Sequence, residues 1–447
     1  MSKKSAVFRR DLKADPPKIV RGAGLYIEDD QGRKYLDGNA SAGVVGIGHG
    51  RTEIAKALYE AGEAVTFVYS GAFTHPWAEG LAEAILSISP KNMAGVYFVS
   101  GGSEANESAL KLARQYFVER CKAQKYKVMA RWQSFHGVTI GTLSLSGRTS
   151  WREIYSPYLL PVTHIAPPYC YRCPFGADQA SCSLVCADDL ERAILLEGPE
   201  TVAAFFAEPV VGTTVTGLTP PPEYYARIRE ICDRYDVLFV ADEVLSGYGR
   251  CGRPFAIQHW KVEPDIMTLG KAIGSGYAPL GAMVVSGKVL EAIRNGSGRF
   301  IHGFTYSGTP LSCFVGLKVF EIMSREHLFE RGSQIGPVIF DKLKALQERR
   351  EVIGEVRGLG LLIGVEFVAD RNTKRPFPKE LGFSALVTEA MRRRNVVVTA
   401  GVPRSNFGKD GDHIQISPPF TITETEVNTL IEALDDALTE VTAFARK

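Results

Sequence analysis

The 447-residue sequence lacks an excess of charge of either sign, since 52 lysine and arginine residues face 50 aspartate and glutamate residues. A nucleic-acid-binding protein usually carries a basic patch or tail, so this balance argues against one. The chain also lacks an apolar run of the roughly 18–20 residues that a membrane-spanning helix needs. Its basic N-terminus has no apolar centre and so does not match a secretory signal. We therefore expect a cytoplasmic protein that binds neither nucleic acid nor membranes.

Low-complexity tracts, heptads and internal repeats are absent as well, which excludes coiled coils and repeat arrays. Aromatic residues are not scarce: they make up 10% of the chain, which is too many for a disordered protein. The length is sufficient for two domains, or for one large core with a smaller one beside it. The chain has the size and composition of an ordinary globular enzyme.

The middle of the chain alternates short apolar runs with helical patterns. Strands are expected at 96–99, 202–207, 238–241, 267–269 and 281–285, with helices at 104–119 and 224–235. Continuous apolar strands separated by helices are typical of a mainly parallel sheet that is covered on both faces. This pattern predicts an α/β fold.

The two ends of the chain have a different character. Residues 25–37 contain two short strand patterns around an Asp-Gln-Gly turn, which indicates a hairpin. A long helical stretch follows residue 311, and a last helix is expected to begin near Thr423 with a capping-box pattern. We expect a smaller α/β domain formed by residues 1–65 and 326–447, and a large domain formed by residues 66–325.

Ligands of open α/β sheets bind at the carboxyl ends of the strands, so the residues at those ends are the candidates for chemistry. The expected strands end in the segments 100–104 (SGGSE), 208–209 (EP), 242–243 (DE) and 270–271 (GK). The first segment is a glycine-rich turn before a helix, whose free N–H groups favour a phosphate. The alternative for that segment is a tight turn with a helix cap.

Asp242 and Lys271 are the two titratable residues at strand ends that stand out. A buried carboxylate such as Asp242 needs donors or a cation, so it either caps a helix or faces a protonated ring nitrogen. Most lysines are solvated, but a desolvated lysine at a strand end has a depressed pKa and is nucleophilic. A phosphate-binding turn, an aspartate for a pyridinium nitrogen and a Schiff-base lysine together describe a pyridoxal-phosphate (PLP) site.

On these residues the sequence resembles the class III PLP-dependent aminotransferases, in particular the ω-aminotransferase group. The resemblance runs from about Leu25 to Leu434, and Asp242 and Lys271 lie 29 positions apart, as the family pattern requires. The motifs that carry it are 98–107 (FVSGGSEANE), 135–137 (FHG), 208–210 (EPV), 242–250 (DEVLSGYGR), 270–276 (GKAIGSG) and 302–310 (HGFTYSGTP). It implies the fold-type I architecture of PLP-dependent transferases.

The resemblance also implies roles for individual residues. Lys271 would hold the cofactor and move the proton of the reaction, and Asp242 would keep the ring nitrogen protonated. Phe135 and Val244 would lie on the two faces of the ring, unless they are ordinary core residues. The other cofactor contacts that the resemblance implies are Gly101, Gly102, Ser103, His136 and Glu208. Thr305 would reach the phosphate of a neighbouring subunit, which implies a homodimer with shared active sites and leaves a higher oligomer open.

The sequence departs from the family pattern on the substrate side. Leu245 stands where many relatives that use 2-oxoglutarate have a glutamine, and no aromatic residue lies near Gly43. Thr399 stands where some members have a switching arginine, and an apparent insertion at 401–409 supplies Arg404 instead. Arg404 is therefore expected to bind the acceptor carboxylate, or else to be a solvated loop residue. Further candidates for the substrate pocket, otherwise simply core aromatics, are Phe67, Tyr69, Phe73, Trp77 and Tyr155.

Four of the eight cysteines lie within 17 residues, at Cys170, Cys173, Cys182 and Cys186. The first two have the CxxC spacing of a structural zinc site. The remaining intervals do not match a standard zinc knuckle, and the family fold needs no such metal. We expect reduced thiols without a metal, with zinc as the alternative.

The expected function is a ping-pong aminotransferase that moves nitrogen from an amine or ω-amino acid to a 2-oxo acid such as pyruvate. A decarboxylating transaminase or an aminomutase on the same fold would keep Lys271 and Asp242 and differ in substrate contacts. A non-catalytic PLP-binding regulatory protein is the alternative outside enzymes, although no DNA-binding or partner module is appended.

Overall fold

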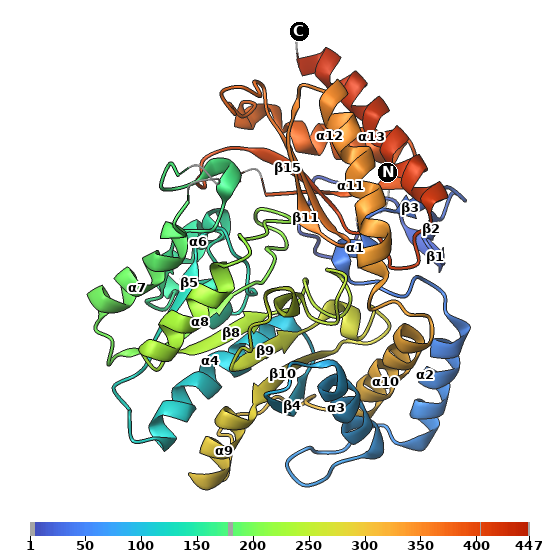
Figure 1. The fold of residues 1–447 in the computed structure, drawn as a ribbon. Coiled ribbons are helices and arrows are strands. Elements are labelled where there is room, and N and C mark those ends of the chain that lie inside the picture. The colour runs from blue at the N-terminus through green and yellow to red at the C-terminus, as the bar shows by residue number, and fades with distance from the viewer. Residues whose placement is uncertain (1–4, 178–181, 403, 446–447) are drawn as a thin grey trace.

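The computed structural model describes residues 5–177, 182–402 and 404–445 (Figure 1). Its largest sheet has seven strands in the order β4 (Met93–Val99), β10 (Gly281–Ser286), β9 (Ile266–Leu269), β8 (Leu238–Asp242), β7 (Val202–Ala207), β5 (Lys127–Arg131) and β6 (Thr163–Ile165). All neighbours in this sheet run parallel except β10, which is antiparallel to both β4 and β9. The prediction of a mainly parallel sheet in an α/β fold is confirmed.

Helices cover both faces of this sheet, which is why its central strands are continuous apolar runs. Side chains along β8 alternate between the two layers: Phe239 packs in one core cluster with Ile228, and Val240 packs in the other with Phe117. Ile228 belongs to α8 (Tyr224–Arg234), and Phe117 belongs to α4 (Gly102–Glu119). Helix α4 begins two residues before the predicted position.

Segments from both ends of the chain share one small sheet. The predicted hairpin is present as β2 (Tyr26–Asp29) and β3 (Lys34–Asp37), flanked by β1 (Ile19–Ala23). Strand β3 also pairs in parallel with β13 (Val396–Val397), which joins the N-terminal segment to the C-terminal one. Figure 1 shows these blue strands beside the orange and red C-terminal elements. The domain boundaries at 65/66 and 325/326 stay a prediction.

A second four-stranded sheet belongs to the C-terminal segment. Its order is β11 (Ile353–Leu359), β12 (Leu362–Phe367), β15 (Asp412–Ile416) and β14 (Thr399–Ala400). The helices of this segment are α11 (Arg331–Arg349), α12 (Phe383–Arg393) and α13 (Glu424–Ala445), the last of which begins where the capping pattern predicts.

A buried ion network ties this sheet to the segment that follows β6. Glu366 of β12 accepts hydrogen bonds from Arg172 Nε at 2.7 Å and from an Arg357 terminal nitrogen at 2.6 Å, and also from the Tyr169 hydroxyl. All four side chains are buried. Buried charges of this kind are tolerated only when they are paired.

The remaining elements connect these layers. The helices are α1 (Ala40–Gly43), α2 (Thr52–Ala64), α3 (Pro76–Ile88), α5 (Ile140–Leu145), α6 (Thr149–Tyr155), α7 (Val185–Glu197), α9 (Gly287–Asn295) and α10 (Pro310–Arg325). Short 3-10 helices lie at Ser156–Tyr158, Cys170–Arg172, Ala256–Trp260, Lys271–Ile273 and Lys379–Leu381. Within the described residues no helix is both long and apolar enough to cross a membrane.

Candidate active site

The register of the large sheet brings three of the candidate residues to one edge. Ala207 lies opposite Ala241 in the β7–β8 pair, and Asp242 lies opposite Thr268 in the β8–β9 pair. Because these strands are parallel, Glu208, Asp242 and Lys271 all leave the sheet at its carboxyl edge. This is the edge where open α/β sheets bind their ligands.

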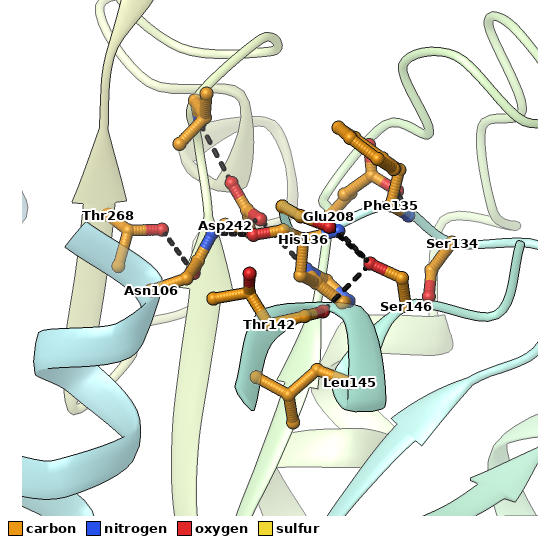
Figure 2. A network of polar contacts seen from close by, with 12 residues as sticks. Asn106, Ser134, Phe135, His136, Thr142, Leu145, Ser146, Glu208, Asp242 and Thr268 are labelled. Carbon is orange, nitrogen blue, oxygen red and sulfur yellow. Dashed lines mark hydrogen bonds and ion pairs between the residues drawn. The ribbon is translucent and has the colours of Figure 1, made fainter. Parts of the chain in front are cut away.

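Asp242 is buried, with 2% of its surface exposed, and it accepts three hydrogen bonds (Figure 2). His136 Nδ1 and Asn106 Nδ2 each lie 2.8 Å from Oδ2, and the Val244 amide donates to Oδ1 at 3.0 Å. No lysine or arginine within the described part of the chain forms an ion pair with this carboxylate. It is therefore held in place by hydrogen bonds while its charge remains available to a cationic ligand.

The two side chains that donate to Oδ2 are themselves fixed. Asn106 accepts a hydrogen bond from Thr268 Oγ1 at 2.9 Å and donates a second one to the His136 carbonyl at 2.9 Å. The His136 amide donates to Ser146 Oγ at 2.8 Å. These contacts hold the Nδ1 edge of the imidazole against Asp242, which favours the tautomer that carries its proton on Nδ1.

Glu208 lies beside this network, with both carboxylate oxygens bonded to backbone amides. Phe135 N is 2.9 Å from Oε1 and Gly212 N is 2.8 Å from Oε2. Burial raises the pKa of Glu208, and the nearby charge of Asp242 raises it further. The hydrogen bond to Glu208 therefore fixes the backbone of Phe135, the residue whose ring is predicted to lie on the cofactor.

Lys271 follows β9 in a conformation that side chains rarely adopt. Its φ is +49°, in the left-handed region, and its side chain is half-buried. Burial lowers the pKa of Lys271 to about 8, against the opposing influence of the Glu208 and Asp242 charges. Strained backbone and a depressed amine pKa are both common at functional sites, and the second makes a lysine nucleophilic near neutral pH.

The glycine-rich turn after β4 forms the start of α4, with Gly101 as its N-cap. A Cβ added at Gly102 would lie 2.6 Å from Val244 Cγ1, so a side chain at Gly102 would displace Val244. Ser103 Oγ accepts a hydrogen bond from the Val138 amide at 3.3 Å. An added Cβ at Gly101 would meet nothing within 4 Å, so the space at the N-cap is open, and the free N–H groups of the first turn suit an anion there.

Other predicted site residues lie outside this network. Phe67, Tyr69 and Thr305 are exposed, and the Phe67 ring lies edge-on to the ring of Tyr306 at 6.0 Å. Arg404 donates to Glu153 Oε1 at 2.5 Å, so its guanidinium is already in an ion pair. The roles given to these residues stay predictions. Pro403, within the predicted insertion, lies outside the described residues.

The four clustered cysteines are present as free thiols. Burial raises the pKa of Cys170, and it raises that of Cys186 to about 12. Among the residues that the structure describes, no three His, Cys, Asp or Glu side chains are grouped closely enough to hold a metal ion. The neighbouring cysteines raise the pKa of Cys170 and Cys186 as well, and the expectation of reduced thiols, with zinc as the alternative, stays a prediction.

The sequence analysis missed the residues that fix Asp242 and His136. Asn106 is the clearest case, because it lies on the same helix face as Ala109 and Ala113, at spacings of three and four residues. An asparagine in an otherwise apolar helical stripe signals a buried polar partner. Thr268 and Ser146 carried no comparable signal.

Comparison with known proteins agrees with this geometry. The class III aminotransferase family (Aminotransferase class-III) matches residues 10–438. The chain belongs to the class III aminotransferases. It is 38% identical to the uncharacterized aminotransferase YodT of Bacillus subtilis (strain 168), over 99% of both chains.

Two solved structures show that this class III chain has the fold of its family. A transaminase from the marine bacterium Virgibacillus is 36% identical, with a TM-score of 0.89 over 96% of this chain and 94% of that one. An amine transaminase from an uncultivated Pseudomonas species, solved in its PLP-bound form, is 33% identical, with a TM-score of 0.90 over 98% of each chain. The protein is a PLP-dependent transaminase of fold-type I, as the resemblance predicts.

The carboxyl edge of the sheet fits this cofactor. At the glycine turn that begins α4, an added Cβ at Gly101 would meet nothing within 4 Å, and free N–H groups at a helix start suit an anion such as phosphate. Apart from the contact with His136, Asp242 has no lysine or arginine partner among the described residues, so its carboxylate could also pair with a pyridinium nitrogen. Lys271 would supply the amine.

Proposed function

We propose that this transaminase moves an amino group from an amine or ω-amino acid to a 2-oxo acid, with pyruvate as the acceptor, in two successive half-reactions. The observation that carries the proposal is the gathering of Asp242, Glu208 and Lys271 at one sheet edge, next to a glycine turn that has open space at Gly101. The solved relative named as an amine transaminase supports an amine donor.

When bound, PLP supplies an electron sink for the negative charge that develops on the reacting substrate carbon. Asp242 holds a proton at the ring nitrogen, because its buried carboxylate stabilises a positive charge there. His136 and Asn106 keep that carboxylate aimed by their bonds to Oδ2. Burial lowers the pKa of Lys271 to about 8, and in its neutral form Nζ would take a proton from the substrate carbon.

The remaining contacts in the proposal orient the cofactor. The backbone N–H groups of Gly101, Gly102 and Ser103 bind the phosphate at the start of α4. Phe135 covers one face of the ring and Val244 covers the other, since Val244 lies directly against the glycine turn.

The substrate side of the site is shaped by Leu245, which is buried. A Cβ added at Gly43 or at Gly212 would lie 2.4 Å from one of the two Leu245 methyl carbons. Leu245 therefore occupies the space that a larger residue near Gly43 would need, and it places an apolar side chain close to Glu208. This packing accounts for the missing aromatic residue near Gly43 and supports an acceptor pocket that differs from that of relatives with a glutamine.

We also propose a homodimer in which Thr305 of one subunit reaches the phosphate site of the other. Phe67, Tyr69, Phe73 and Tyr306 are all large aromatic side chains with at least 39% of their surface exposed in the single chain. Exposed aromatic groups of this kind usually mark an interaction surface.

The test measures the two half-reactions separately with the purified holoenzyme. An amine or ω-amino acid alone should yield about one carbonyl product per active site, and pyruvate added afterwards should yield one alanine. A panel of donors with pyruvate and 2-oxoglutarate then ranks the substrates by kcat/KM. Release of carbon dioxide would indicate the decarboxylating alternative, a rearranged amine an aminomutase, and no product in either half-reaction a non-catalytic protein.

A further inference from the structure

Arg148 lies beside Phe135, one of the residues proposed to contact the cofactor ring. Gly147 pairs with the backbone that leads into Phe135, since its carbonyl accepts from Gln133 N at 3.1 Å and its amide donates to Ser134 O at 3.0 Å. The guanidinium carbon of the next residue, Arg148, is 5.8 Å from the centre of the Phe135 ring. Arg148 is the N-cap residue of α6, and the pairing of Gly147 with residues 133 and 134 holds its guanidinium next to the aromatic ring.

The Arg148 guanidinium has no protein partner within the described residues. Its Nε is buried without a hydrogen bond, and it takes part in no ion pair there. Neighbouring arginines differ in this respect. Arg152 donates to the carbonyls of the α5 end, and Arg404 is paired with Glu153.

Arg148 is only partly exposed and its Nε is buried, and an unpaired cation that has lost part of its hydration is costly. Burial and the charge of Arg10 lower the pKa of Arg148 to about 10, which still leaves the side chain protonated at neutral pH. An anion bound to Arg148 would compensate both for its lost hydration and for the repulsion by the charge of Arg10.

The geometry of Arg148 leaves its hydrogen-bond donors free. Its guanidinium carbon lies 3.6 Å from the centre of the Trp151 ring, a stacking distance. Stacking uses the face of the guanidinium, whereas its N–H donors point outward in the plane and match the two oxygens of a carboxylate. The contact with Trp151 therefore uses none of the hydrogen-bond donors of Arg148.

We infer that Arg148 binds the carboxylate of the amino-acid and oxo-acid substrates and so selects substrates that carry one. The inference rests on the proposed function for the identity of the substrates, but not for the existence of the anion site. Arg404 is the competing candidate. It would have to leave Glu153 before it could bind a carboxylate, whereas Arg148 has no ion pair to break among the described residues.

The first experiment measures binding without chemistry. Propionate, a carboxylate without a reactive amine or carbonyl, is titrated calorimetrically into the holoenzyme, with propionamide as its neutral counterpart. Arg148→Met should weaken propionate binding roughly 10- to 100-fold, as expected for a charge-assisted hydrogen bond, and leave propionamide unchanged. Arg148→Lys should give an intermediate loss, and the exposed Arg10→Met should give a loss of no more than about twofold.

The second experiment compares acceptors that differ in the carboxylate. In Arg148→Met, kcat/KM should fall at least about tenfold for pyruvate and stay within about twofold for propanal, which has no carboxylate. Equal losses for both acceptors, unchanged propionate affinity, or no propionate binding to the wild-type protein would overturn the inference. The same pattern in Arg404→Ala, with Arg148→Met unaffected, would assign the role to Arg404. If no acceptor were aminated by the wild-type enzyme, the proposed function would fail, while the propionate titration would still decide the role of Arg148.

Discussion

His136 and Asp242 form a buried pair in which the imidazole Nδ1 lies 2.8 Å from the carboxylate Oδ2. The same oxygen accepts from Asn106, so both donors meet one side of the carboxylate and Oδ1 keeps only the Val244 amide. Figure 2 shows these side chains converging from separate elements. This asymmetry leaves one carboxylate oxygen able to accept a further donor, as a protonated ring nitrogen requires.

Replacing Asp242 by asparagine should lower turnover by at least about a hundredfold while cofactor binding stays detectable. An amide has no charge to hold a pyridinium proton, and its NH₂ group would face one of the existing donors in either orientation. Both half-reactions should be measured, with Asp265→Asn as the control. Asp265 is a buried aspartate bonded to Arg229 at the other end of the sheet. Turnover near that of the wild type in Asp242→Asn would remove this residue from its proposed role.

Much of this arrangement could be predicted because the carboxyl ends of parallel strands meet at one edge. The apolar runs of β7 and β8 mark the strands, so the polar residues that follow them had to gather. The pairing of β3 with β13 could not be predicted in this way, because β13 has only two residues. The same holds for Arg404 and Glu153, which are 251 positions apart and meet only in the folded chain.

Replacing Gly102 by alanine should weaken cofactor binding roughly tenfold, because the new methyl group would lie 2.6 Å from Val244 Cγ1. The dissociation constant is measured by titrating the apoprotein with PLP. Gly62→Ala is the control, since Gly62 lies within α2 and an added Cβ meets nothing within 4 Å. If the clash is the cause, Gly102→Ala combined with Val244→Ala should lose less affinity than the two single losses together predict.

Replacing Glu366 by glutamine should lower the free energy of unfolding by about 3–5 kcal/mol, because Arg357 and Arg172 would be left as buried, unpaired cations. Denaturant unfolding measures the change. Glu53→Gln breaks an exposed pair with Arg325 and should cost less than about 1 kcal/mol. A similar small loss in both variants would show that the network is not stabilising.

The stability contributed by Glu366 should also depend on pH. Burial opposes ionisation of this carboxyl, but Arg357 and Arg172 outweigh it and hold its pKa below the ordinary value. A carboxyl with a lowered native pKa stabilises the fold above its unfolded pKa of about 4.3, and that stability is lost as the pH falls. The difference between the wild type and Glu366→Gln should therefore shrink as the pH is lowered below about 4.

Replacing Lys271 by alanine should abolish turnover and the covalent attachment of the cofactor. Borohydride reduction of the holoenzyme, followed by peptide mass spectrometry, should place PLP on the peptide that contains Lys271 in the wild type and nowhere in the variant. Lys125→Met is a matched control, because burial lowers the pKa of Lys125 as well, but this lysine donates to three backbone carbonyls away from this edge. Labelling of another lysine in the wild type would contradict the assignment.

The reaction of the apoprotein with PLP should depend on pH with a midpoint near 8. Only the neutral amine attacks the cofactor aldehyde, and burial lowers the pKa of Lys271 to about 8 from its ordinary value of 10.5. The attachment rate should rise about tenfold per pH unit below that midpoint and level off above it, when followed by stopped-flow absorbance.

The lowered pKa of Lys271 also affects the stability of the apoprotein. Between pH 8 and 10.5 the unfolded chain binds more protons at this lysine than the folded chain does, so the free energy of unfolding increases as the pH rises. A rate that still climbed past about pH 9.5 would mean that Lys271 is solvated in the apoprotein. The wild-type apoprotein would then gain no more stability between pH 8 and 10.5 than Lys271→Ala does.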